Sequence, residues 1–296
     1  MQLLVYFCRY KTNQISIHMK RTFILLLSAV LLAGLLTSCK KKKGDPPVLP
    51  DEASMIIDFS NFEIGKSADL FTLEKGTENG NWEFAATVAG YWRAVLTSTL
   101  IVPVSAFKLA IDQTPVWLEE NTWEWNYSAS VFSVTYKARL VGQIRASDVL
   151  WTMYVTREGT GGYPEFVWFE GTSALDGNSG QWILNHSYTY QESVLQIDWT
   201  KSGTSMGTVK YTYVRTLNDN RETDTFSGSY IEYGRTSNTL DAYYSIHYYS
   251  LAYQTFWDVE VEWSTVSYYG RIQCSPYFQD SDWHCWNSQL VNSTCE

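Results

Sequence analysis

The sequence predicts a mostly β (α+β) fold, in which an antiparallel meander forms a barrel or a strongly curved sheet covered by one or two N-terminal helices. Aromatic residues make up 16% of the 296 residues and Pro occurs only seven times, a composition that suits strands. Apolar and polar residues alternate in many segments after Trp117. Clusters of Gly, Asn, Asp and Ser divide this region into roughly ten short strands.

Helical spacing occurs before the strand region. Residues 81–100 carry apolar side chains at intervals of three and four, and Asn81 can cap the first turn. Pro103 is expected to end this helix, because proline lacks the N–H that a helix interior needs. Proline is favoured at a first helical position, so a second short helix is expected over 104–111. Residues 55–59 are read as a short strand.

The strand region alternates most clearly over 131–140, where every second residue is apolar. The residues expected on that apolar face are Phe132, Val134, Tyr136, Ala138 and Leu140. Two further segments, 149–155 and 165–169, read as mostly buried strands, and 259–263 alternates again. Turn signals separate the strands at 159–162, 176–180, 202–207 and 218–220. Connections this short favour antiparallel neighbours.

The first part of the chain carries the pattern of an export signal. Lys20 and Arg21 precede an uncharged apolar run over 22–36, which closes on Leu36-Thr37-Ser38-Cys39. A basic start, a short apolar centre and small residues before a cleavage point are typical of such signals. Met19 directly precedes the basic pair and is the expected start of translation.

The ending at Cys39 resembles the lipobox of bacterial lipoproteins, whose signal peptide is removed just before the cysteine that carries the lipid. The resemblance implies that 1–38 is the export signal and that Cys39 is the acylated, membrane-attached first residue of the mature chain. An uncleaved membrane helix is the alternative, because Arg21 and Lys40 bracket 18 uncharged residues, the lower limit of a span. The lysines would then keep the following domain in the cytoplasm.

Residues 39–54 are expected to form the lipidated cysteine and a flexible tether, because four lysines at 40–43 precede three prolines. Residues 55–296 are expected to form a single mostly β domain. Lipobox, tether and aromatic body together resemble uncharacterised outer-membrane lipoproteins of the Bacteroidota. In that group acidic residues after the cysteine often mark surface export, and lysines stand here instead. The resemblance therefore implies attachment to the outer membrane and leaves the periplasmic or surface side open.

The charge distribution argues against nucleic-acid partners. Only 14 of the 22 basic residues, but all 31 acidic residues, follow residue 43. A domain with this balance repels phosphate backbones. We therefore expect no DNA or RNA partner.

One motif is typical of hydrolases. Residues 203–207 match G-x-S-x-G, whose serine needs a strand before it and a helix after it. Strand-like segments stand on both sides of Ser205, so a hairpin loop is the better interpretation. His247 and His284 follow in the order of a triad, but nothing pairs either with this serine. The sequence therefore predicts no hydrolase and no enzyme.

Metal ligation and paired carboxylates have equally weak support. Residues 176–180 begin like a calcium loop but lack the later acidic ligands, so a turn rich in Asp and Asn is expected. Adjacent acids at 119–120 and alternate acids at 260 and 262 fit solvated positions better than a glycosidase pair. No metal and no cofactor are expected.

Three cysteines remain in the expected mature chain after Cys39, in a compartment where disulfides persist. Cys274 alternates in phase with apolar residues and is expected to be a buried thiol. Cys295 lies near the end of the chain, where a bond to Cys285 would hold the tail. Cys285–Cys295 is the preferred pairing, and the two other pairings stay open.

The many aromatic residues suggest that the protein binds a ligand, and they are compatible with more than one kind of ligand. Most aromatic side chains must form the core, but some can line a cavity under the helices or an exposed platform. By analogy of fold, the leading hypothesis is a non-catalytic binding protein for an apolar or amphipathic ligand. The alternatives are a surface protein that binds glycans through exposed aromatics, and a structural or assembly subunit of an envelope complex. The sequence does not identify the ligand-binding residues.

Overall fold

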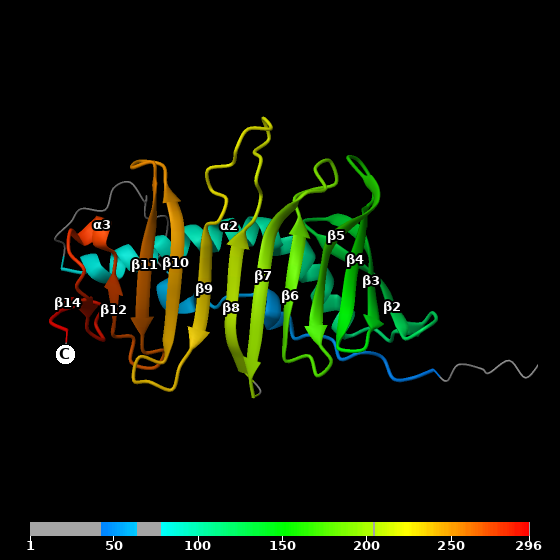
Figure 1. Ribbon diagram of the computed structural model, residues 1–296, viewed down its shortest axis with the longest axis horizontal. Helices are drawn as coiled ribbons and strands as arrows, with labels where there is room; N and C mark the ends of the chain where they lie inside the picture. The colour runs from blue at the N-terminus through cyan, green and yellow to red at the C-terminus, as the bar shows by residue number, and fades with distance from the viewer. Residues whose placement is uncertain (1–42, 64–77, 204, 296) are drawn as a thin grey trace, which may run out of the picture. The chain divides into compact units, whose positions relative to one another are not determined.

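Fourteen antiparallel strands form one sheet in the described part of the chain, and they lie side by side in the order of the sequence (Figure 1). The sheet begins with β1 and ends with β14, and these two strands do not pair with each other. The prediction of a curved antiparallel meander is therefore confirmed, and its closed-barrel alternative is wrong. The strands are β1 (Val116–Trp117), β2 (Thr122–Val131), β3 (Val134–Ile144), β4 (Asp148–Arg157), β5 (Tyr163–Ala174), β6 (Ser179–Asn185), β7 (Ser193–Ser202), β8 (Ser205–Tyr213), β9 (Tyr230–Arg235), β10 (Ala242–Ser250), β11 (Thr255–Trp263), β12 (Gly270–Gln273), β13 (His284–Trp286) and β14 (Asn292–Ser293).

The computed structural model describes residues 43–63, 78–203 and 205–295. Residues from Gly44 onward form one compact unit. The expected export signal and Cys39 lie outside the described residues.

One long helix, α2 (Gly80–Ile111), lies across one face of the sheet (Figure 1). It contacts β2 and β3 near one end of the sheet and β12, β13 and β14 near the other. The expected break at Pro103 is wrong, because α2 runs through this residue and includes the second predicted helix. Pro103 is buried, and packing of this helix face outweighs the cost of the missing N–H, about 3 kcal/mol.

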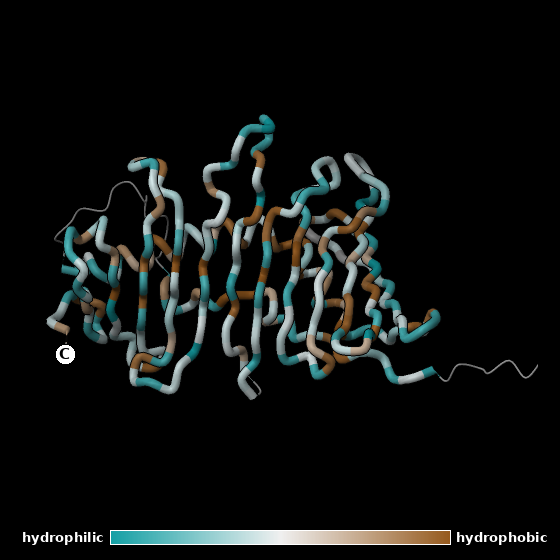
Figure 2. The backbone as a smooth tube through the Cα atoms, in the orientation of Figure 1, coloured by the Kyte–Doolittle hydropathy of each residue, from teal (hydrophilic) through white to brown (hydrophobic). Residues whose placement is uncertain are grey.

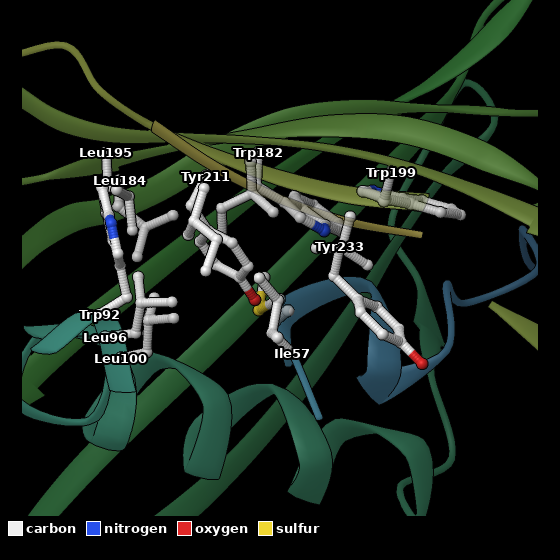
Figure 3. Close-up of a cluster of buried hydrophobic side chains, with 14 of the residues drawn as sticks. Ile57, Trp92, Leu96, Leu100, Trp182, Leu184, Leu195, Trp199, Tyr211 and Tyr233 are labelled. Atoms are coloured by element: carbon white, nitrogen blue, oxygen red, sulfur yellow. The ribbon is translucent and has the colours of Figure 1, made fainter. Parts of the chain in front are cut away.

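By length and composition alone, α2 could cross a membrane, and among the described helices it alone meets that test. Core helices of soluble proteins pass the same test. The side chains that α2 buries include Trp92, Leu96, Leu100 and Phe107. Figure 3 shows the first three of these facing the sheet.

The segment before α2 packs against the sheet. Pro47 and Pro50 are buried, and Val48 lies so close to the β5–β6 turn that a Cβ on Gly177 would be 3.1 Å from it. The flexible tether expected over 39–54 therefore does not extend through these residues. The short helices η1 (Glu52–Met55) and η2 (Ser60–Phe62) follow, so the strand expected over 55–59 is absent from this described segment.

Hydropathy alternates along the strands (Figure 2). The buried apolar residues of the strands form one core cluster with those of α2. Tyr136, Ala138 and Leu140 are buried in this cluster, as the alternation predicts. Phe132 is not, because it lies in the β2–β3 turn with φ 47° and is 82% exposed. A turn of this kind interrupts the period of two, so the residue leaves the face that the sequence assigns to it.

Tryptophan and glycine alternate across five neighbouring strands. In the register from β2 to β6, Trp123 pairs with Gly142, Gly142 with Trp151, Trp151 with Gly171, and Gly171 with Trp182. All three tryptophans are buried. Each indole thus lies opposite a residue without a side chain, which lets large rings share one face of a dense sheet.

Candidate functional site

Helix α2 separates two cavities. The first, the aliphatic cavity, lies between α2, the segment 55–63 and β8, and it has a volume of about 570 Å³. The second, the aromatic groove, is bounded by α2, the β8–β9 loop, the β10–β11 turn and α3 (Ser275–Phe278). The opposite face of the sheet carries polar and aromatic side chains.

Six branched apolar side chains line the aliphatic cavity. They are Ile56, Ile57, Leu96, Leu100, Ile101 and Val104. These six come from two parts of the chain, one before α2 and one on α2 itself. Hydrogen bonds hold the first part in place: the hydroxyl of Tyr244 on β10 donates to the carbonyl oxygen of Asp58 over 2.6 Å. The carboxylate of Asp58 accepts the N–H of Ser60 over 2.9 Å.

Tyr211 on β8 supplies the buried polar group of the aliphatic cavity. Its side chain is fully buried, and its hydroxyl has no hydrogen-bond partner among the described residues. Figure 3 shows the hydroxyl end of Tyr211 directed from the sheet toward Ile57. Burial raises the pKa of Tyr211 well above its ordinary value. The group therefore stays neutral and can both donate and accept a hydrogen bond.

Charged side chains occur where the aliphatic cavity meets solvent. The guanidinium of Arg93 on α2 lies 3.0 Å from the carboxylate of Glu63, and both side chains are about half exposed. The cavity thus combines apolar side chains, the buried neutral hydroxyl of Tyr211 and further polar side chains that include the Arg93–Glu63 ion pair. An arrangement of this kind suits a molecule with an apolar body and polar groups at defined positions.

The opposite face of the sheet carries a row of rings that cover one another. His247 stacks on Tyr230 with centroids 5.6 Å apart and on Phe256 with centroids 4.4 Å apart. The ammonium of Lys210 lies 3.8 Å from the centre of the Tyr230 ring. These ring faces contact each other and Lys210, so a sugar ring approaching the row would meet mainly ring edges.

The structure assigns local roles to the other residues of the sequence analysis. Cys285 and Cys295 form a disulfide that links β13 to the end of the chain, and Cys274 is a buried thiol. Ser205 begins β8 directly after β7, so the G-x-S-x-G match lies in a hairpin, as the sequence predicts. The carboxylate of Asp176 accepts the N–H of Asn178 in the β5–β6 turn.

The histidines and paired acids lie apart from both cavities. Nδ1 of His247 lies 2.6 Å from Asp258, and Nε2 of His284 lies 2.9 Å from Asp280. The alternate acids 260 and 262 bond to Ser245 and Arg271, and 119–120 lie before β2. Within the described residues, no three His, Cys, Asp or Glu side chains converge as a metal site would require.

Sequence reasoning missed the residues of the aliphatic cavity. Tyr211 belongs to the strand-like segment after residue 207, and its alternation with Val209 could have placed it on the inner face. No local signal marks the convergence of 55–63, 93–105 and 211, because these residues are far apart in the sequence. No family model, curated protein or solved structure matches the chain.

Proposed function

We propose that this protein is a membrane-anchored, non-catalytic binding protein that holds an amphipathic ligand in the aliphatic cavity. The observation that carries the proposal is the unpartnered hydroxyl of Tyr211 at an apolar cavity of about 570 Å³. Ligand pockets typically have volumes of about 300–1,000 Å³, apolar walls and a few polar groups that fix orientation. This cavity has each of these properties.

The polar groups limit the chemistry of the ligand. A buried hydroxyl without a partner costs about 1–3 kcal/mol, and a ligand hydroxyl or carbonyl beside Tyr211 would remove that cost. A carboxylate at the same depth would be unfavourable, because the described lining offers it no cation there. A charged headgroup would instead lie near Arg93 and Glu63. The best fit is an alkyl or acyl chain with a neutral oxygen.

Membrane attachment is the second part of the proposal. It rests on the lipobox resemblance at Cys39 and places the protein at the outer membrane of a bacterial envelope. Cys39→Ala should lack the mass of the acyl groups and keep the apolar export signal, because a lipobox signal is cut before the lipidated cysteine. An intact mass that differs from that of the wild type only by the exchange of cysteine for alanine would support the uncleaved-helix alternative.

Native mass spectrometry tests ligand binding directly. The unit Gly44–Glu296 contains the whole described sheet and α2, and it would be purified from an exporting host without denaturation. We expect extra mass that organic solvent removes, and rebinding of decan-1-ol to the emptied protein. A clean mass without ligand, together with no uptake of decan-1-ol, would contradict the proposal.

A matched pair of variants locates the bound molecule. Tyr211→Phe removes only the cavity hydroxyl and should weaken decan-1-ol binding about three- to tenfold. Tyr230→Phe makes the same chemical change on the opposite face of the sheet and should leave binding unchanged. Equal effects of both variants would place the probe outside the aliphatic cavity.

A further inference from the structure

The aromatic groove lies on the other side of α2 and has two adjoining parts. The outer part has a volume of about 320 Å³ and the inner part, the inner chamber, about 170 Å³. Four aromatic residues line both parts, so the two parts adjoin each other along these rings. They are Tyr91, Phe226, Tyr248 and Tyr249.

Two buried polar groups line the inner chamber without a partner. Trp92 is 3% exposed and Ser229 is 5% exposed. Neither Nε1 of Trp92 nor Oγ of Ser229 has a hydrogen-bond partner among the described residues. Each such group costs about 1–3 kcal/mol when it stays unpaired. Trp92 can only donate, so whatever satisfies it must supply an acceptor.

The outer part of the groove consists largely of rings. Tyr91 on α2 is 38% exposed and Tyr253 in the β10–β11 turn is 67% exposed, so both are accessible from solvent. Tyr248 on β10 and Trp257 on β11 also line this part, and their ring centroids are 6.0 Å apart. Aromatic side chains arranged in this way favour a flat ring over a flexible chain.

No charged side chain occurs among the described residues that line either part of the groove. A charged ligand would therefore lose its hydration without an opposite charge, which is costly. The acceptor that reaches the inner chamber must therefore be neutral, and a neutral oxygen meets this requirement. A carbonyl has two lone pairs and can accept from both donors.

We propose that the aromatic groove is a second binding site, which takes a neutral ring compound whose carbonyl oxygen accepts hydrogen bonds from Trp92 and Ser229. The ring body occupies the outer part and the carbonyl enters the inner chamber. The site goes beyond the function proposed for the aliphatic cavity, because different residues line it and it selects rings in place of chains.

Two probes that differ in one oxygen test the proposal. Isothermal titration calorimetry on the full-length chain compares 2-acetylnaphthalene with 2-ethylnaphthalene, which has nearly the same shape but no acceptor. We expect the ketone to bind about three- to tenfold more tightly. Ser229→Ala should remove much of this difference while leaving the affinity for 2-ethylnaphthalene unchanged. Trp92→Phe keeps an aromatic ring, removes the other donor and should act in the same direction.

A stability measurement separates this role from a structural one. Ser229→Ala removes a hydroxyl that has no partner among the described residues, so the melting temperature of the free protein should not fall. Tyr211→Phe is the control for the other cavity and should leave the affinity for the ketone unchanged.

Several results would overturn the proposal. Equal affinity for the two naphthalenes would show that a ligand oxygen does not engage the donors, and so would an unchanged preference in Ser229→Ala. Loss of ketone binding in Tyr211→Phe would place the probe in the aliphatic cavity. Absence of binding up to the solubility of both probes would also refute the site. None of these results depends on decan-1-ol, so the two proposals can fail separately.

Discussion

Replacing Gly171 by alanine tests whether the alternation of tryptophan and glycine determines the packing of the sheet. Gly171 lies between Trp151 on one neighbouring strand and Trp182 on the other. Its φ is not in the left-handed region, so alanine meets no backbone penalty there. Any loss of stability must come from the space that the new methyl group needs.

That space is occupied. A Cβ on Gly171 would overlap the carbonyl oxygen of Gln181 and would lie 2.6 Å from Cε3 of Trp182. The oxygen belongs to the neighbouring strand, and Trp182 is fixed by full burial and by its hydrogen bond to Ser54 over 3.2 Å. Neither can yield without a shift of the strand. Overpacking of this kind costs about 1–3 kcal/mol, and we expect the upper end.

Gly90 provides the control within the same chain. It lies in α2 and is exposed, and a Cβ at this position would have no neighbour within 4 Å beyond its own turn of helix among the described residues. Alanine is the better helix former, so Gly90→Ala should stabilise the protein by about 0.5–1 kcal/mol. Replacing glycine by alanine should thus change the free energy of unfolding in opposite directions at the two sites.

Urea denaturation followed by tryptophan fluorescence measures both changes. The free energy of unfolding of Gly171→Ala should fall and that of Gly90→Ala should rise, with the same dependence on urea as the wild type. A loss of less than about 0.5 kcal/mol in Gly171→Ala would refute the close packing that the reasoning assumes.

Three further predictions concern stability. Reduction of Cys285–Cys295, which closes a loop of sequence separation 10, should lower the free energy of unfolding by about 2–3 kcal/mol, as melting with and without reductant would show. The carboxyl group of Asp241 has a pKa below its ordinary value of 3.8. Burial alone would raise this pKa, but the N–H and the hydroxyl of Thr265 donate hydrogen bonds to the carboxylate and help to lower it. The ionised carboxylate of Asp241 therefore stabilises the fold above pH 3.8. Asp241→Asn should lower the free energy of unfolding there, and this loss should shrink as the pH falls below 3.8 in acid titrations. Tyr211→Phe removes an unpaired hydroxyl, so the melting temperature without ligand should stay level or rise, and a fall would mean that the hydroxyl has a partner.

Local patterns predicted the elements better than their junctions. The period of two predicted an antiparallel sheet, and helical spacing predicted the first part of α2. The prediction that the helix ends at Pro103 was wrong, because burial of this helix face is a tertiary effect that the segment alone does not show. The prediction that Phe132 lies on the apolar face was wrong, because the alternation in the sequence continues through a turn in which the chain reverses direction.

The Trp–Gly row and the cavities need information that a single sequence lacks. Gly142 and Trp151 face each other only in one strand register, and a shift by one residue would move every side chain to the other face. The aliphatic cavity requires in addition that segment 55–63 and α2 meet the sheet near Tyr211. The sequence predicted a ligand cavity under a helix by analogy of fold alone, and could not say which residues line it.

The two cavities also explain why α2 is apolar around most of its circumference. A helix that covers a sheet needs one apolar stripe, with polar residues on the remaining faces. On α2 the inward stripe contacts the sheet, and residues beside it line cavities: Ile101 and Val104 on one flank, Tyr91 and Val95 on the other. Charged residues that face a bound ligand would be desolvated, so the proposed binding and folding both favour apolar residues there, and Arg93 lies where the aliphatic cavity meets solvent. The composition that makes α2 long and apolar enough to span a membrane thus fits the two proposed binding sites beside one core helix.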